Sequence, residues 1–471
     1  MMKRKMQFGL LLLVVALSGM LGSCGDNHID IETPAVYLAD ESQPVVFTDF
    51  TPTEGGVRTA MFINGSNFGT DTAHIRVIIG GQKAKIIKSS GTQIYCLVPP
   101  RADGGSVKVE ITKSNGDPLA DHTYEQGFKY IYNTVVSTLW GTVDEYGNAG
   151  IKDGPFATAS MADPYDIWYE NYGGKRVCYF VDDPTSLRLM DLDTKEVSTL
   201  FTKGQMGLNN MGAGIAWSLD RDTMYIGNNQ GTEDGIGAYF ALRSENFQTP
   251  HPMLVGRDYN CIFTHPVDGT IFLTRGYDGT LHQAIFNPKT EMWDVKNLGT
   301  IAGGSGWFQH CVFHPSGNYA YLIGRDRDCI QKAIYDWDAK TLKSATAFVG
   351  SLGSRGYADG VGTSARFDEP TEGCFAKNEK YVQEGKSDVY DFYVTDMWNH
   401  CIRKITPEGD VTTYAGRGSW SADEKRDGYI DGDLTQTARF NVPTGICYEE
   451  STGTFYITDN RNHRVRMITV Q

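Results

Sequence analysis

Three ionisable side chains stand at matching places in a repeated sequence pattern: Asp166, His310 and Glu372. Each precedes or begins a short apolar segment, while other copies of the pattern hold Gly or Cys at the same place. Two carboxylates and an imidazole can together bind a cation, or they can act as general acid and base. The simpler alternative is that they hydrogen-bond to channel water and to neighbouring strands. The residues favour this alternative, so we predict no metal ion, no cofactor and no catalytic residue.

Aromatic and charged residues near these three extend the candidate surface. Trp307 lies in the Gly-rich segment GGSGWF, directly before the apolar segment of His310. A large flat ring suits stacking on the apolar face of a sugar. Arg275 and Arg325 lie in turns where the clearest copies carry Asp, and a guanidinium can hold a carboxylate, such as that of a uronic acid, through two hydrogen bonds. Packing within their own loops, or exposure to solvent, remains the alternative for each of these residues. The predicted ligand-binding residues are Tyr165, Asp166, Tyr259, Asn260, Arg275, Tyr277, Trp307, Gln309, His310, Arg325, Glu372 and Trp398.

A strand–turn–strand unit that occurs six times positions these residues. Residues 392–406 (FYVTDMWNHCIRKIT) and 455–469 (FYITDNRNHRVRMIT) are its clearest copies, and weaker ones begin at residues 178, 224, 271 and 320. A short apolar strand precedes each copy, and its second residue recurs at intervals of 48, 47, 49, 62 and 73 residues. A period of about 40–50 residues with several short strands predicts a propeller blade of four antiparallel strands.

The turn inside this unit has its own pattern. Asp396 and Asp459 end the second strand in the clearest copies, and we assign Asp183 to the same column. An Asp at such a place most simply accepts hydrogen bonds from the backbone N–H groups of its own turn. His400 and His463 belong to the repeat, and successive blades separate them, so they are not a ligand pair.

The sixth copy lacks its own fourth strand. Residues 136–141 (VSTLWG), which precede the first copy, resemble residues 411–416 (VTTYAG), the fourth strand of the fifth copy. We therefore predict that residues 134–141 complete the last blade and close the ring, because closure removes an exposed strand edge.

These motifs resemble the NHL-repeat six-bladed propeller. The resemblance rests on VTTYAG, on RDGYIDGDLTQTARFNVPTGI at residues 426–446 and on YITDNRNHRVRMI, and it assigns residues 133–471 to the propeller. It is strongest in the first, fifth and sixth units and weak in the middle three.

A separate β-rich unit precedes the propeller. GSNFG at residues 65–69, IGGQKAKII at 79–87, IYCLVPP at 94–100 and GSVKVEIT at 105–112 follow in an order that resembles an IPT/TIG domain over residues 46–132. This resemblance implies an immunoglobulin-like sandwich that serves as a spacer or interaction domain. The predicted fold is thus all-β: an immunoglobulin-like sandwich followed by a six-bladed NHL-type β-propeller.

The N-terminus has the features of a secretory signal. Lys3, Arg4 and Lys5 precede an apolar run that is too short to span a membrane as a helix. Leu21-Gly22-Ser23-Cys24 resembles a lipobox, which implies a lipoprotein signal peptide at residues 1–23, lipidation of Cys24 and a polar, acidic tether at residues 24–45. The expected location is the outer membrane, lipid-anchored and facing the cell exterior.

Composition narrows the function. The net charge of −14 argues against nucleic acid as a partner, since such binding needs a basic face. The eight other cysteines form no close-spaced framework, and we expect them to serve mainly as small core residues. A surface lipoprotein with this domain order resembles accessory glycan-handling proteins. We expect a non-catalytic protein that binds a polysaccharide, an oligosaccharide or a partner protein, with outer-membrane glycan-uptake proteins as candidate partners. The alternative is a propeller-type polysaccharide hydrolase or lyase, although no G-x-S-x-G motif is present.

Overall fold

The computed structural model describes residues 36–102, 104–182, 186–202, 204, 214–276, 278–301, 308–416 and 427–471, with the side chains of Phe308 and Gln309 excepted. Several features named above lie outside these residues: the signal peptide at 1–23, Cys24, the tether as far as residue 35, Asp183, Tyr277 and Trp307. In the described part of the chain, no helix has the length and apolar character needed to cross a bilayer.

The N-terminal unit is a sandwich of two antiparallel sheets, as the sequence predicts. One sheet has the order β1-β3-β7-β6, and the strands are β1 (Val46–Thr51), β3 (Ala60–Ser66), β7 (Gln93–Leu97) and β6 (Lys85–Ser89). The other has the order β5-β4-β8-β9, and the strands are β5 (Gln82–Lys83), β4 (Ile75–Ile79), β8 (Val107–Thr112) and β9 (Pro118–Thr123). A short pair, β2 (Glu54–Gly55) and β10 (Lys129–Tyr130), lies at the end of the unit.

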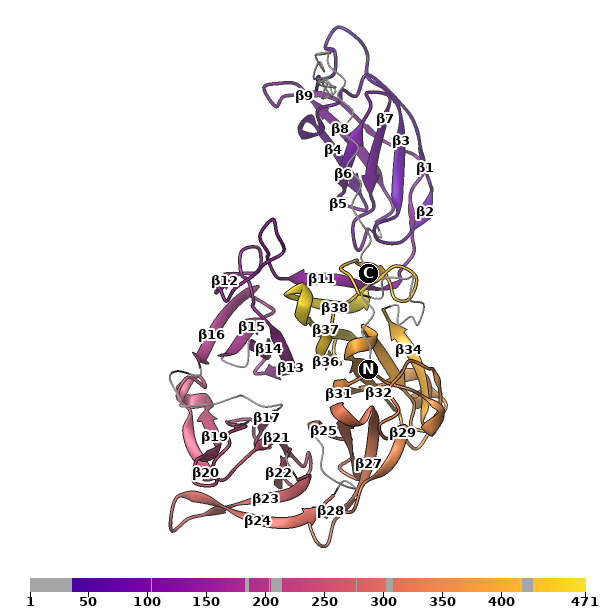
Figure 1. Ribbon diagram of the computed structural model, residues 1–471. Coiled ribbons are helices and arrows are strands. Elements are labelled where there is room, and N and C mark those ends of the chain that lie inside the picture. The colour runs from indigo at the N-terminus through magenta and orange to yellow at the C-terminus, as the bar shows by residue number, and fades with distance from the viewer. Residues whose placement is uncertain are drawn as a thin grey trace, which may run out of the picture.

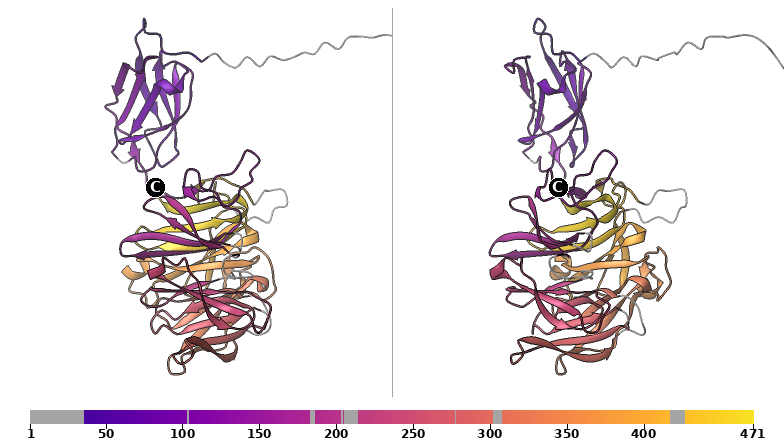
Figure 2. Two further views of the ribbon diagram at one scale, coloured as in Figure 1. Left: turned by 90° about the vertical axis from the view of Figure 1, so that its left-hand side faces the viewer. Right: turned by 60° about the vertical axis from the view of Figure 1, so that its left-hand side comes forward.

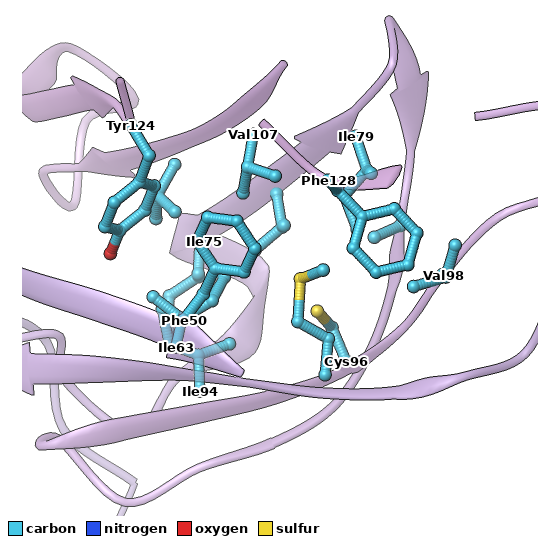
Figure 3. Close-up of a cluster of buried hydrophobic side chains, with 14 of the residues drawn as sticks. Phe50, Ile63, Ile75, Ile79, Ile94, Cys96, Val98, Val107, Tyr124 and Phe128 are labelled. Carbon is cyan, nitrogen blue, oxygen red and sulfur yellow. The ribbon is translucent and has the colours of Figure 1, made fainter. Parts of the chain in front are cut away.

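Alternating side chains of the two sheets fill the core of this sandwich. Val107, Val109 and Ile111 on β8 are fully buried, whereas the residues between them are half-buried. Figure 3 shows Phe50, Cys96 and Phe128 among the side chains that meet between the sheets. This period-two burial is what a sheet with one covered face requires.

The C-terminal unit is a ring of six blades, which confirms the predicted propeller (Figure 1). Six apolar clusters fill the spaces between neighbouring blades, including the space between the last blade and the first. Each blade buries both faces against its neighbours, so the core runs around the whole ring.

The first three blades are built from consecutive strands. Blade 1 contains β13 (Pro164–Tyr172), β14 (Lys175–Asp182), β15 (Ser186–Asp191), β16 (Glu196–Thr202) and the edge strand β12 (Gly154–Pro155). Blade 2 contains β17 (Ile215–Trp217), β18 (Thr223–Gly227), β19 (Ile236–Leu242) and β20 (His251–Val255). Blade 3 contains β21 (Tyr259–Thr264), β22 (Ile271–Arg275), β23 (Thr280–Asn287) and β24 (Met292–Thr300).

The second half of the ring carries the insertions. Blade 4 contains β25 (Phe308–Phe313), β26 (Tyr319–Gly324), β27 (Cys329–Asp336), β28 (Thr341–Leu342) and β29 (Thr346–Gly350). Blade 5 contains β31 (Pro370–Lys377), the short helix α2 (Glu379–Gln383), β32 (Tyr390–Asp396), β33 (Cys401–Ile405), β34 (Asp410–Ala415) and the edge strand β30 (Gly360–Val361). Blade 6 contains β36 (Pro443–Glu449), β37 (Thr454–Asp459), β38 (Arg464–Val470), β11 (Thr134–Trp140) and the edge strand β35 (Gly432–Asp433). Short 3-10 turns among the described residues lie at 72–74, 243–245, 325–327, 362–364, 397–399 and 460–462.

The ring closes as predicted, by a strand from the beginning of the propeller. β11 pairs with β38 in antiparallel register, from Thr134 opposite Val470 to Trp140 opposite Val465. Asn133 and Gln471 add two backbone hydrogen bonds at the end of this ladder. The third strand of blade 6 therefore has a partner on each side.

A buried ion-pair cluster recurs in blades 1, 5 and 6, and we call it the Arg clamp. A fully buried arginine on the third strand lies 2.7–2.9 Å from two aspartates, one ending the second strand and one preceding the edge strand. The three clamps are Arg188 with Asp182 and Asp153, Arg403 with Asp396 and Asp359, and Arg466 with Asp459 and Asp431.

The contacts of the clamp revise two details of the sequence analysis. Asp182, one place before Asp183, makes the same contact with the clamp arginine as Asp396 and Asp459 do. Asp396 and Asp459 accept backbone N–H groups from the segment before the inner strand, from Asp368 and Asn441 respectively, and not from their own turns. The aspartates are structural, but they join separate segments of a blade.

The sandwich stands beside the rim of the propeller, next to blade 6 (Figures 1 and 2). Arg58 of the sandwich contacts Asp431 at 2.8 Å, and the same aspartate pairs with Arg466 of the blade 6 clamp. The junction is therefore connected directly to the clamp and to the closing strand.

Candidate functional site

An irregularity at the start of the innermost strands decides which side chains face the channel. The pairing of inner and second strands shifts register in blades 1, 3, 4, 5 and 6, between residues 164 and 167, 259 and 261, 308 and 310, 370 and 373, and 443 and 445. A β-bulge of this kind turns a side chain away from the direction that strict alternation would give it. Asp166, His310 and Glu372 lie within or at the end of three of these bulges.

The structure brings these three residues together from blades 1, 4 and 5. One ligand atom from each, a ring nitrogen or a carboxylate oxygen, lies within 4.8 Å of the other two. His310 Nε2 is 3.3 Å from Glu372 Oε1. All three side chains are buried, with 5% of Asp166, 6% of His310 and 1% of Glu372 exposed.

Backbone groups of two other blades hold Glu372 in place. Its Oε2 accepts hydrogen bonds from the N–H groups of Ile167 and Ile446, each at 3.0 Å. Trp168 stacks on His310, with ring centroids 6.1 Å apart and an interplanar angle of 23°. The carboxylate and the imidazole are therefore oriented by their surroundings.

Burial moves all three groups toward their neutral forms. It raises the pKa of Asp166 to about 7, although the positive charge of Arg325 acts in the opposite direction. It raises the pKa of Glu372 well above its ordinary value, and the nearby Asp166 adds to this effect. Burial also lowers the pKa of His310 to about 4. Charges in a site that excludes water are costly when no counter-charge lies close by.

A cavity of about 450 Å³ begins at His310 and Glu372 and follows the inner strands of all six blades. Its wall carries an aromatic ring from each blade. These rings are Trp168 and Tyr169, Trp217, Phe263, Phe313, Phe375 and Tyr448.

Among the described residues, the wall of the cavity extends beyond the strands at the end where the inner strands finish. Ser218, Leu219 and Arg221, in the turn after β17, and Pro266, after β21, line it together with the strand residues. Leu219 is 52% exposed, so this end of the cavity reaches the surface. We call these four residues the cavity lip, and they belong to blades 2 and 3.

Most of the predicted ligand-binding residues lie elsewhere. His310 and Glu372 line the cavity, and Asp166 lies beside them. Tyr259 is buried in the core between blades 2 and 3, and Asn260 is also buried. Trp398 lies just after the end of β32, and this end pairs with the beginning of β31. Phe375 of the cavity wall lies farther along β31 and pairs with Phe392, near the start of β32. Trp398 thus lies toward the opposite mouth of the channel.

Both predicted carboxylate-binding arginines already contact carboxylates of the chain. Arg275 lies 2.8 Å from Glu233, and Arg325 lies 2.8 Å from Glu369. Tyr165 packs against the core between blades 1 and 2, and Tyr277, Trp307 and the side chain of Gln309 lie outside what is described. The structure therefore draws together Asp166, His310 and Glu372 from the predicted set.

The aromatic wall was not predicted, although the sequence contains a signal for it. In the aligned apolar strands, the place two residues after the recurring position holds Tyr169, Trp217, Thr264, Phe313, Phe375 and Tyr448. Five of six residues in that column are aromatic. We had expected the binding aromatic residues in loops, whereas these lie within the strands.

Comparison with known proteins agrees with both units. Residues 44–132 match the IPT/TIG domain and residues 440–466 match the NHL repeat. An auxiliary nutrient binding protein from Bacteroides thetaiotaomicron is 35% identical, with a TM-score of 0.71, and the match covers 92% of this chain and 99% of that one. A second auxiliary nutrient binding protein, from Bacteroides ovatus, is 31% identical, with a TM-score of 0.68, and the match covers 92% and 100%. The chain belongs to the family of these two proteins.

Curated proteins that match at lower identity are covered only in part. NHL repeat-containing protein 2 of Gallus gallus is 23% identical over 346 residues, which are 69% of this chain and 41% of that protein. The chain thus spans less than half of the length of the curated relatives it matches.

Proposed function

We propose that this protein is a non-catalytic, lipid-anchored surface protein that binds a glycan nutrient in the channel cavity. The aromatic wall is the observation that carries the proposal. A cavity of about 450 Å³ falls in the size range of small-molecule sites, roughly 300–1,000 Å³, which combine apolar walls with a few placed polar groups. Here His310 and Glu372 supply polar groups at the inner end.

The chemistry of the wall suits a sugar. The rings of the half-buried Trp168 and of Trp217, which is 7% exposed, both contribute apolar surface to the wall, and such rings give contact area at low conformational cost. Arg221 lies over the ring of Trp217, 5.6 Å from its centroid, and adds a positive charge at the lip. The description of two family members as nutrient binding proteins supports the same function.

Calorimetric titration of the full chain with neutral and uronic-acid oligosaccharides tests this function. We expect saturable binding by one of these classes, with a change in tryptophan fluorescence because two tryptophans line the cavity. Trp217→Ala should weaken binding by about ten-fold or more, by analogy with base stacking on aromatic rings, which contributes about 1–3 kcal/mol per ring.

Trp398→Ala is the matched control, because it removes the same side chain toward the other mouth of the channel. It should leave the affinity unchanged. A larger loss for Trp398→Ala than for Trp217→Ala would move the binding site to the mouth that the sequence suggested.

The surface location is a separate part of the proposal and rests on the lipobox resemblance at Cys24. Cys24→Ala should release the protein from the membrane fraction while the folded domains stay intact. In the anchored protein, the channel would present a bound glycan to outer-membrane uptake proteins. A Cys24→Ala variant that still fractionates wholly with membranes would contradict the anchor.

A second candidate function is that of a polysaccharide hydrolase or lyase. One observation favours it: the pKa of Asp166 is raised to about 7 by burial, beside an imidazole and a second carboxyl group at the end of a cavity. Groups that titrate near neutral pH in a cavity are frequent general acids and bases. Product formation from a bound polysaccharide, abolished by Glu372→Gln with binding retained, would establish this activity in place of simple binding.

A further inference from the structure

The cluster of Asp166, His310 and Glu372 has the geometry of a metal-binding site. Tetrahedral zinc sites have metal–ligand bonds of about 2.0–2.1 Å to imidazole nitrogen and carboxylate oxygen, which places neighbouring ligand atoms about 3.4 Å apart. His310 Nε2 and Glu372 Oε1 are 3.3 Å apart. All three ligand atoms lie within 4.8 Å of one another, a separation that small side-chain rotations can close.

The hydrogen bonding of His310 is a second, independent observation. The residue is 6% exposed, and among the described residues neither ring nitrogen has a hydrogen-bond partner. The contact with Glu372 is short but lacks the direction of a hydrogen bond. Since leaving a buried polar atom unpaired typically costs about 1–3 kcal/mol, a folded protein rarely keeps two such atoms on one ring without a ligand.

The carboxylates are arranged for the same purpose. Glu372 uses Oε2 to accept two backbone N–H groups, which leaves Oε1 directed at the imidazole. Asp166 has Arg325 as its charged neighbour, but that guanidinium already lies 2.8 Å from Glu369. The cluster therefore contains two buried acids, and the protein offers only part of the positive charge that their ionised forms would need.

We propose that Asp166, His310 and Glu372 bind one divalent transition-metal ion, with Zn²⁺ as the best fit, inside the propeller channel. One imidazole nitrogen and two carboxylate oxygens are ligands that Zn²⁺ accepts, whereas Ca²⁺ and Mg²⁺ prefer sites made of oxygen alone. Three protein ligands leave a fourth position, which faces the cavity that starts at His310 and Glu372. Because the ligands come from blades 1, 4 and 5, the ion would join three blades across the channel.

Metal uptake by the full chain tests the site without reference to any glycan or activity. After treatment with EDTA and removal of the chelator, native mass spectrometry should show uptake of one Zn²⁺ per chain, and calorimetry should give the affinity. Asp166→Asn, His310→Ala and Glu372→Gln should each weaken binding by at least about 100-fold, since even the loss of an outer partner of a metal ligand costs about 10–100-fold. Zn²⁺ should also raise the unfolding temperature of the wild type and of none of these variants.

His251→Ala is the matched control. His251 Nε2 lies 2.8 Å from Glu245, so the chain contains a second His–carboxylate pair, but this one is half-exposed and is not part of a three-ligand cluster of described residues. The variant should keep full Zn²⁺ affinity. Glu372→Gln and Asp166→Asn are close in shape to the wild type, so the test holds even if His310→Ala fails to fold.

Three results would overturn the proposal. They are the absence of stoichiometric Zn²⁺ uptake by the wild type, unchanged affinity in Asp166→Asn and Glu372→Gln, and saturation by Ca²⁺ or Mg²⁺ with no response to Zn²⁺. Absence of glycan binding would leave the metal site in place, so this inference and the proposed function fail separately.

Discussion

Blades 1, 5 and 6 differ from blades 2, 3 and 4 in how each blade is held together. The first group carries the Arg clamp, with arginines that are fully buried. In the second group, strand pairing places Tyr239, His282 and Gln331 where the clamp has arginine. Blades 2 and 3 also lack an edge strand among their described residues. The residues that make the repeat recognisable in sequence are therefore those that stabilise individual blades.

The cavity, in contrast, opens to the surface at blades that lack the clamp. All six blades contribute to its wall, but the lip that reaches the surface comes from blades 2 and 3. In the described part of the ring, blades 2, 3 and 4 lack the arginine and aspartates that define the clamp. Their turns do not have to hold these residues in place, so the turns can differ in sequence. This contrast teaches that the degenerate repeats, and not the clear ones, are where to look for specificity.

Removing the closing strand should have the largest effect on this arrangement. Deletion of residues 134–141 takes one strand from a clamped blade and leaves β38 with an open edge. We expect loss of cooperative thermal unfolding and aggregation through the new edge, measured by calorimetry and light scattering. Shortening the exposed connection at α2 is the control and should leave both readouts near the wild type. A monodisperse deletion variant with unchanged unfolding would contradict closure by β11.

Breaking one clamp should have the next largest effect. Arg403→Ala leaves Asp396 buried without its cation, and removing one partner of a buried pair typically costs about 3–5 kcal/mol. Gln331→Ala, at the matching place in blade 4, should cost about 1 kcal/mol or less, because the side-chain oxygen of Gln331 has no hydrogen-bond partner. Chemical denaturation measures both. Equal losses would mean that the clamp gives clamped blades no special stability.

The cavity lip should separate binding from stability. Arg221→Ala removes an exposed side chain, so we expect the free energy of unfolding to change by less than about 0.5 kcal/mol. Glycan affinity should fall, more so for an acidic glycan than for a neutral one, because the guanidinium charge is lost. Arg257→Ala, which removes a partly exposed arginine from the connection between blades 2 and 3, is the control. A similar loss of affinity in both variants would show that the lip has no special role.

The smallest expected effect concerns pH and the clamp position of blade 3. His282 lies 2.9 Å from Thr280 Oγ1 and 3.4 Å from Tyr259, with the charged groups of Arg275, Asp278 and Glu233 nearby. Burial, with Arg275 adding to it, lowers the pKa of His282 below its ordinary value. Below an unfolded-state pKa of about 6.5, the unfolded chain therefore binds the proton more readily, and stability falls as the pH is lowered.

His282→Gln should flatten this part of the stability profile by at most one proton, about 1.4 kcal/mol per pH unit. Unfolding curves between about pH 4 and 7, compared between the variant and the wild type, measure the difference. The clamped blades have arginine at this position, which keeps its charge over the same range. A difference that grows with rising pH would contradict the direction of the shift.

The propeller, the strand order of its blades and its closure could be predicted from the sequence. A strand that is ambiguous in one copy of the repeat can be recognised by alignment with the other copies. The apolar strands of Asp166, His310 and Glu372 align with one another, so their convergence on the channel could be anticipated. The error of one residue at Asp183 arose in a weak copy, where two consecutive acids fit the column equally well. The contacts of Asp182 with Arg188 resolve it.

The cavity wall could not be predicted with the same ease. The bulges at the beginning of the inner strands shift the alternation, so sequence parity alone does not say whether Trp168 or Tyr169 faces the channel. Strand pairing also decides which mouth a residue lies near. Trp398 follows the second strand of blade 5, β32, and the antiparallel pairing with β31 places that end of the strand away from the cavity.

The closing strand has a mechanical consequence. The chain passes from the sandwich into β11 at Asn133, so any pull on the N-terminal side reaches the propeller first through the β11–β38 ladder. The contact between Arg58 and Asp431 shares that load with the clamp of blade 6. Under tension, the ring should therefore yield at its seam before any other blade.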